Sequence, residues 1–141
     1  MAYETKTRPT AVEVGDFLAA VEPERRRVEA QVVCDMLAEV SGEPPVMWGP
    51  SIVGFGRYHY RYDSGHEGDA ARIGFSPRKA NLVLYIVPGF QERADLTARL
   101  GKVKTSVSCL YINKLADVDM GALRELAVWS LDVMRDRYPQ A

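Results

Sequence analysis

The spacing of the apolar residues changes twice along this chain of 141 residues. Residues 22–42, "EPERRRVEAQVVCDMLAEVSG", carry an apolar residue at every fourth position, which is typical of an amphipathic helix. Residues 50–63, "PSIVGFGRYHYRYD", alternate with a period of two, which indicates a strand. Residues 118–138 return to the helical spacing. The fourfold stripe consists of Val28, Val32, Met36 and Val40, with Val33 and Leu37 beside it.

Helices are predicted over residues 13–20, 23–41, 92–101 and 119–137. Pro23 suits the first turn of the second helix, and Gly42 followed by two prolines ends it. Asp119 is a suitable cap for the last helix. Trp129 lies near the apolar stripe of that helix, so we expect it to pack on the domain.

Strands are predicted over residues 51–62, 69–75, 81–87 and 107–112. The turn signals between them are short, so consecutive strands should pair antiparallel. The predicted order is α-α-β-β-β-α-β-α. The expected fold class is therefore α+β, a single mainly antiparallel sheet with helices packed mainly on one face. We expect residues 1–12 to be a disordered segment and residues 13–141 to form one domain.

Composition limits the function classes. The net charge is −1, which argues against nucleic acid and anionic membranes as partners. No apolar run is long enough to span a bilayer, and the opening residues lack the apolar segment of a secretory signal, so we expect a cytoplasmic protein. Cys34 and Cys109 both sit in apolar runs and are expected to be buried free thiols.

Several strings resemble one known family. "MWGPSIVGFGRYHYRYDSGHEGD", "GFSPRKANLVLYIVPGF" and "LGKVKTSVSCLYINKLADVD" occur in the order typical of the YdhG-like family, the bacterial domain of unknown function 1801. The resemblance covers about residues 14–138 and implies a small α+β domain. Most members have no assigned activity, and one distant branch is described as a frataxin-like iron chaperone.

The chain departs from this resemblance in one loop. Relatives tend to read "GKHKTGKSCLYIKKL" where this chain reads "GKVKTSVSCLYINKL". Val103, Ser106, Val107 and Asn113 thus replace a histidine, a glycine and two basic residues. These replacements argue against carrying a basic or nucleophilic role over from the family to that loop.

Both histidines of the chain lie in "RYHYRYDSGHEGD", residues 57–69. Imidazole and carboxylate groups suit iron or zinc, so the stretch is a candidate metal site. The alternative is a polar β-hairpin, because the spacing matches no metal motif and the ligands straddle a glycine-containing turn. We favour the hairpin and predict no cofactor. The candidate ligands are His59, Asp63, His66 and Glu67, with Asp69 nearby.

Two further features are candidates for ligand binding. Tyr58, Tyr60 and Tyr62 share one face of a predicted strand, either as core or as a stacking wall. Basic side chains of two turns could flank a shallow groove beside Trp48 and hold a small anion, or could simply be solvated. These basic residues are Arg78, Lys79, Lys102 and Lys104.

No catalytic motif appears in the sequence, and the nearest idea is Ser106 and Ser108 with Lys102. The leading interpretation is a non-enzymatic binding or chaperone-like domain for a small ligand, an anion or iron. One alternative is an interaction module that forms a homo-oligomer or meets another protein. The other alternative is an enzyme of unrecognised type.

Overall fold

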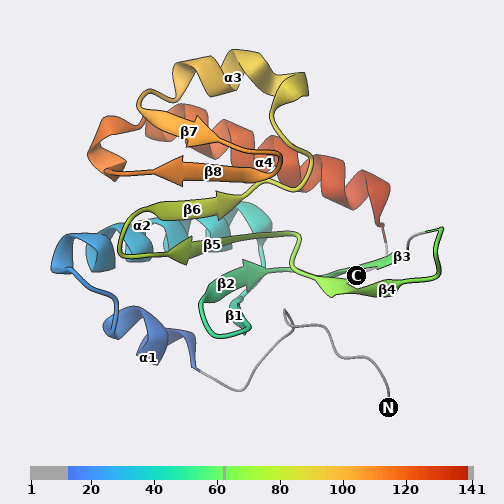
Figure 1. The fold of residues 1–141 in the computed structure, drawn as a ribbon, viewed down its shortest axis with the longest axis horizontal. Helices are drawn as coiled ribbons and strands as arrows, with labels where there is room; N and C mark the ends of the chain where they lie inside the picture. Colours follow the sequence, from blue (N-terminus) through green and yellow to red (C-terminus); the bar gives the residue numbers. More distant parts are fainter. Residues whose placement is uncertain (1–12, 62, 140–141) are drawn as a thin grey trace.

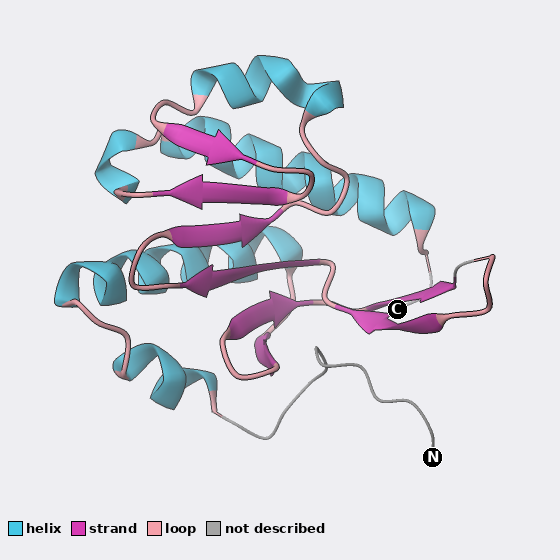
Figure 2. Cartoon of the chain, in the orientation of Figure 1, coloured by secondary structure: helices cyan, strands magenta, loops and turns pink. Residues whose placement is uncertain are grey.

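The computed structural model describes residues 13–61 and 63–139. Within these ranges one six-stranded antiparallel sheet, with strand order β1-β2-β5-β6-β8-β7, is joined by the two-stranded hairpin β3-β4 (Figures 1 and 2). The helices are α1 (Val14–Ala19), α2 (Glu24–Ser41), α3 (Ala94–Arg99) and α4 (Met120–Arg137), with 3-10 turns η1 (Gln91–Arg93) and η2 (Leu115–Asp117). The strands are β1 (Pro45–Trp48), β2 (Ile52–Phe55), β3 (Tyr58–Arg61), β4 (Glu67–Ala70), β5 (Ile73–Pro77), β6 (Leu82–Tyr85), β7 (Val103–Thr105) and β8 (Cys109–Ile112).

This architecture confirms the predicted α+β class, with mainly one sheet and helices packed on it. The ends of the long helices were predicted to within one residue. Gly42 closes α2 in the left-handed conformation, and the Asp119 side chain caps α4 by accepting a hydrogen bond from the Ala122 amide. The predicted disorder of residues 1–12 falls outside the described residues.

The buried face of α2 differs from the predicted stripe. Val28 and Val32 are 59% and 43% exposed, whereas Val33 and Leu37 are fully buried. A spacing of four residues overshoots the helical turn of 3.6, so positions 28 to 40 drift around the helix and cannot share one narrow face. The face that meets the sheet consists of Ala30, Val33, Cys34 and Leu37, which are spaced by three or four residues and therefore stay on one side of the helix.

Trp129 packs against the core from α4, as predicted, but its side chain is half-buried rather than enclosed. Cys34 is buried, and Cys109 is half-buried on β8, so the prediction of two buried thiols holds fully only for Cys34.

The prediction of one strand over residues 51–62 is wrong. Gly56 has φ +73, a conformation that favours glycine, and it separates β2 from β3. Beyond this kink the chain leaves the main sheet and pairs with β4. The predicted strand 69–75 divides in the same way, because β4 ends at Ala70 and β5 begins at Ile73.

The prediction also missed β1 and β7, which have only four and three residues. These short strands form the two edges of the main sheet. In the described chain, no helix combines the length and apolar character that a membrane crossing requires.

Candidate functional site

Alternation along β1 divides its side chains between two environments. Met47 joins the core between the sheet and the helices, together with Val53 of the neighbouring strand. Val46 and Trp48 therefore point to the opposite face of the sheet. The register places Val46 opposite Gly54 and Trp48 opposite Ile52. The helix-free face at this edge of the sheet thus carries a tryptophan.

The indole of Trp48 lies over β2 because position 54 has no side chain. A Cβ atom at Gly54 would come within 2.4 Å of Trp48 Cδ1 and 2.8 Å of its Nε1. The ring is 2% exposed, and its Nε1–H has no hydrogen-bond partner among the residues that the structure describes. A buried donor without a partner costs about 1 to 3 kcal/mol. Such an atom therefore calls for an explanation.

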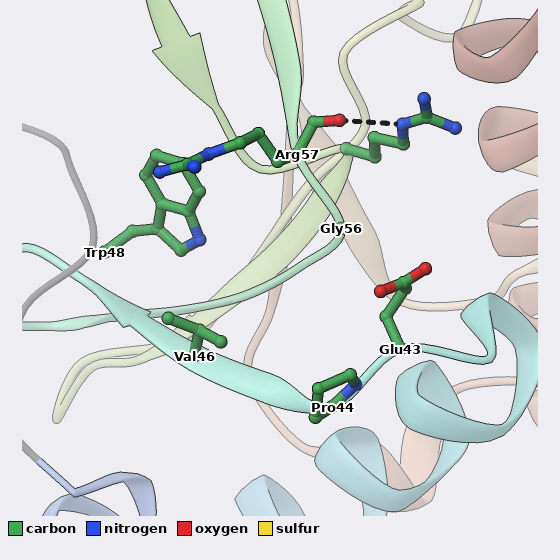
Figure 3. Close-up of a pocket in the computed structure, with 7 residues that line it drawn as sticks. Glu43, Pro44, Val46, Trp48, Gly56 and Arg57 are labelled. Carbon is green, nitrogen blue, oxygen red and sulfur yellow. Dashed lines mark hydrogen bonds between the residues drawn. The ribbon is translucent and has the colours of Figure 1, made fainter. Parts of the chain in front are cut away.

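A pocket of about 400 Å³ opens beside this ring (Figure 3). Its volume lies within the range of small-molecule sites. We call it the tryptophan pocket. It is lined by Glu43, Pro44, Val46, Trp48, Gly56, Arg57 and Arg72.

Arg57 flanks the tryptophan on the kinked connection from β2 to β3. Its Cζ atom lies 5.6 Å from the centroid of the Trp48 ring, within the range of a cation–π contact. Its guanidinium has no hydrogen bond or ion pair with another described side chain, so its donors remain open to a ligand.

Arg72 holds the backbone of this connection. Its Nε donates to the Arg57 carbonyl at 3.0 Å, as Figure 3 shows, and its Nη2 donates to the Tyr138 carbonyl at 2.9 Å. A Cβ at Gly56 would lie 3.2 Å from Arg72 Cδ. The glycine thus permits both the kink and the close approach of Arg72.

The predicted metal ligands form a polar hairpin. His59 Nε2 lies 2.6 Å from Glu67 Oε1, and His59 Nδ1 lies 3.0 Å from Asp69 Oδ1. The hydrogen bonds to Glu67 and then Asp69 raise the pKa of His59, and the bond from His59 lowers the pKa of Glu67. Both ring nitrogens are thus engaged with carboxylates across the β3–β4 pair.

His66 and Asp63 lie apart from this arrangement. The His66 ring is 6.0 Å from the ring of Tyr60, and Asp63 is exposed in the turn. Within residues 13–61 and 63–139, no group of three or more histidine, cysteine or acidic side chains is arranged to hold a metal ion.

Of the three tyrosines predicted to share one strand face, Tyr58 and Tyr60 are described by the structure, and Tyr62 lies outside the described residues. Tyr58 is buried, and its ring lies 4.6 Å from Tyr138 at the end of α4. Tyr60 is half-buried, with its ring 6.2 Å from that of Tyr58. Tyr58 thus serves as packing between the hairpin and the C-terminal helix.

The four basic candidates do not gather beside Trp48. Lys102 and Lys104 lie at the β7 edge of the sheet, whereas Trp48 lies on β1 at the opposite edge. The predicted single groove is therefore wrong for these two lysines, because the strand order separates them. They line a second shallow pocket with Tyr111 and Asn113.

Arg78 and Lys79 lie in the turn between β5 and β6, outside the lining of the tryptophan pocket. Arg78 Nη2 donates to the Tyr85 hydroxyl at 3.1 Å. Lys79 is exposed.

The loop that departs from the family resemblance is the β7–β8 hairpin and the segment after it. Val107 is 88% exposed at its tip. Ser106 Oγ lies 3.5 Å from the Tyr111 hydroxyl, and Ser108 Oγ donates to the Val87 carbonyl at 3.2 Å. Among the described residues, neither serine hydroxyl is thus hydrogen-bonded to a histidine, lysine or carboxylate that could act as its general base.

Of the residues that line the tryptophan pocket, only Trp48 was predicted from the sequence, and the three charged side chains, Glu43, Arg57 and Arg72, were missed. The available signal was the pair Gly54 and Gly56, since glycines inside a strand mark a bulge or a close approach of another group. That signal indicates an irregular strand but not which side chains meet there.

Comparison of this chain with known protein families, curated proteins and solved structures found no match.

Proposed function

We propose that this chain is a non-enzymatic binding domain for a small organic anion, with the tryptophan pocket as its site. The observation that supports this most directly is the buried Trp48 Nε1–H, which has no partner among the described residues and lies at the wall of a pocket beside the Arg57 guanidinium. The Nε1 atom is itself buried, so a shift of the indole toward the pocket would bring this orphan donor within reach of a ligand oxygen.

The chemistry of the lining favours a carboxylate with an apolar body. A guanidinium binds a carboxylate through two parallel hydrogen bonds, and an ionised acceptor strengthens each of them. Pro44 and Val46 supply apolar surface next to the charged wall. The lining residues that the structure describes include no serine, cysteine or histidine that could act as nucleophile or proton carrier, which favours binding over catalysis.

Two wider proposals accompany this one. The resemblance in sequence supports membership of the YdhG-like family, and the α+β architecture agrees with it. Cys34 and Cys109 are free thiols, as is common in a reducing compartment, which supports a cytoplasmic location.

Tryptophan fluorescence tests the binding proposal. The chain has two tryptophans, so Trp129→Phe leaves Trp48 as the sole emitter. Titration of this variant with octanoate should change the emission of Trp48 and give a Kd below about 1 mM, that is, a binding free energy more favourable than about −4 kcal/mol. Octanamide, which has the same shape without the charge, should bind at least tenfold more weakly.

Substitutions test whether Arg57 is the side chain that binds the carboxylate. In the same background Arg57→Ala should weaken octanoate binding at least tenfold, and Arg57→Lys should recover only part of it because a lysine cannot form the bidentate pair. Arg61→Ala, at an exposed arginine at the end of the neighbouring strand β3 and outside the pocket, is the matched control and should have no effect. Equal binding of octanoate and octanamide, or none of either, would contradict the proposal.

A further inference from the structure

Among the residues that the structure describes, Glu43 is the one acidic side chain in the lining of the tryptophan pocket. It follows the C-terminal cap of α2 and lies before β1, whereas Trp48 is the last residue of β1. Figure 3 shows the two side chains on opposite sides of the pocket. The pocket thus has a basic and indole-lined end at Arg57 and Trp48, and an acidic end at Glu43.

The position of Glu43 is fixed by the backbone around it. Its amide donates to Ser41 Oγ at 3.1 Å, and the Ser41 carbonyl accepts from Arg135 Nη2 of α4 at 2.8 Å. The Glu43 carboxylate itself has no hydrogen bond or ion pair with the described residues. Arg57 and Arg72 line the same pocket, yet neither approaches Glu43 closely enough to form a salt bridge.

Apolar surface separates the two charged ends. Pro44, Val46 and Trp48 share one face of the extended chain because alternate residues of a strand point to the same side. Four residues of strand span about 13 Å, so a ligand that touches both ends needs a body of several carbon atoms. Pro44 and Val46 form the floor beneath that body.

Building on the proposed function, we infer that the ligand is a zwitterion whose carboxylate and ammonium groups are separated by an apolar chain. The carboxylate accepts hydrogen bonds from Arg57 and from the unpaired Trp48 Nε1–H. The chain lies on Pro44 and Val46, and the ammonium donates to the Glu43 carboxylate. A simple carboxylate leaves Glu43 without a partner, and a dicarboxylate places a second negative charge beside it.

Three linear acids of equal chain length test this inference in the Trp129→Phe background. 8-Aminooctanoate should bind about tenfold more tightly than octanoate, and octanedioate should bind more weakly than octanoate. 5-Aminopentanoate, which is too short to reach both ends, should lack the tenfold advantage over pentanoate.

Glu43→Gln separates the inference from the proposed function. The substitution should abolish the difference between 8-aminooctanoate and octanoate, while octanoate should still bind, at least as tightly as before, because the negative charge that opposes a carboxylate in the pocket is removed. Glu39→Gln, at an exposed position of α2 outside the pocket, should keep the difference. Circular dichroism should show nearly equal melting of both variants, because neither carboxylate is buried and the ion pair that Glu39 forms with Arg124 is solvent-exposed.

The possible failures are distinguishable. Equal affinity for 8-aminooctanoate and octanoate, or a difference that persists in Glu43→Gln, would overturn the zwitterion inference and leave the anion site standing. Absence of binding by all these acids would overturn the site itself.

Discussion

Arg26 and Trp48 are both buried polar side chains, and both have a donor, Arg26 Nε and Trp48 Nε1, without a partner among the described residues; Arg26 is nevertheless held by its other donors. The guanidinium of Arg26 is fully buried, and its Nη1 donates to Glu29 Oε1 at 2.8 Å while its Nη2 donates to the Asn113 carbonyl at 3.1 Å. Glu29 Oε2 in turn accepts from the Leu115 amide at 2.7 Å. Burial lowers the pKa of Arg26, and the charge of Glu29 opposes that change. This network attaches α2 to the segment after β8, whereas the indole of Trp48 is left without such a partner.

Removal of one member of this pair should be costly. Arg26→Met leaves the Glu29 carboxylate buried without its cation, and we expect a loss of about 3 to 5 kcal/mol in the free energy of unfolding. Urea denaturation measures this loss. Arg25→Met, at an exposed neighbour on the same helix, is the control and should change stability by less than about 0.5 kcal/mol. A similarly small effect of Arg26→Met would show that the pair is not needed for stability.

The helices could be predicted from the sequence because their ends are signalled locally. Gly42 and Asp119 act on their own backbone neighbours, and the structure uses both as expected. The strands were harder to predict, because the alternation of residues 50–63 continues through Gly56 although the backbone turns away there. Periodicity reports which side a residue faces, but not the dihedral angle at which a strand breaks.

The candidate site depends on contacts that no local pattern contains. Trp48 was predicted as a binding residue, but its neighbours come from the end of α2, from the kink after β2 and from the residue before β5. They meet because β1, β2 and β5 pair in one register. Conversely, Lys102 and Lys104 were grouped with Trp48 although four strands lie between β1 and β7.

The β3–β4 hairpin carries a pH-dependent pair. The pKa of His59 is raised, so its contribution is complete below the unfolded value of 6.5 and is lost as the pH rises through the folded value. The pKa of Glu67 is lowered, so its contribution is complete above 4.5 and is lost as the pH falls through the folded value. The pair should therefore be strongest between these two pH values.

Nuclear magnetic resonance of the His59 ring tests this pair. We expect a titration midpoint above 6.5 that falls in Glu67→Gln, because the largest cause of the shift is removed. The side chains are half-exposed, so 1 M salt should also lower the midpoint. Asp63→Asn, in the turn between β3 and β4, is the control and should leave the titration midpoint of His59 unchanged. A midpoint that is insensitive to Glu67→Gln would show that the hydrogen bond does not persist in solution.

The molecule as a whole consists of a main sheet with its helices and a hairpin that extends from the ends of the neighbouring strands β2 and β5. The hairpin joins the main sheet through the kink at Gly56 and through the two residues between β4 and β5. Its further attachment is to the C-terminal end of α4, close to the hairpin in Figure 1. There the Tyr58 and Tyr138 rings meet at 4.6 Å, and Arg72 Nη2 donates to the Tyr138 carbonyl.

This arrangement predicts that the hairpin can open without unfolding of the main sheet. Tyr138→Ala removes a ring pair worth about 1 kcal/mol but keeps the carbonyl that Arg72 binds. Amide hydrogen exchange in β3 and β4 should then accelerate by roughly fivefold, because local opening requires only the free energy of the contacts that it breaks. Exchange in β5, β6 and β8 should stay unchanged, and Tyr138→Phe, which keeps the ring, should resemble the parent protein. Equal acceleration in all strands would mean instead that the hairpin and the main sheet unfold as one cooperative unit.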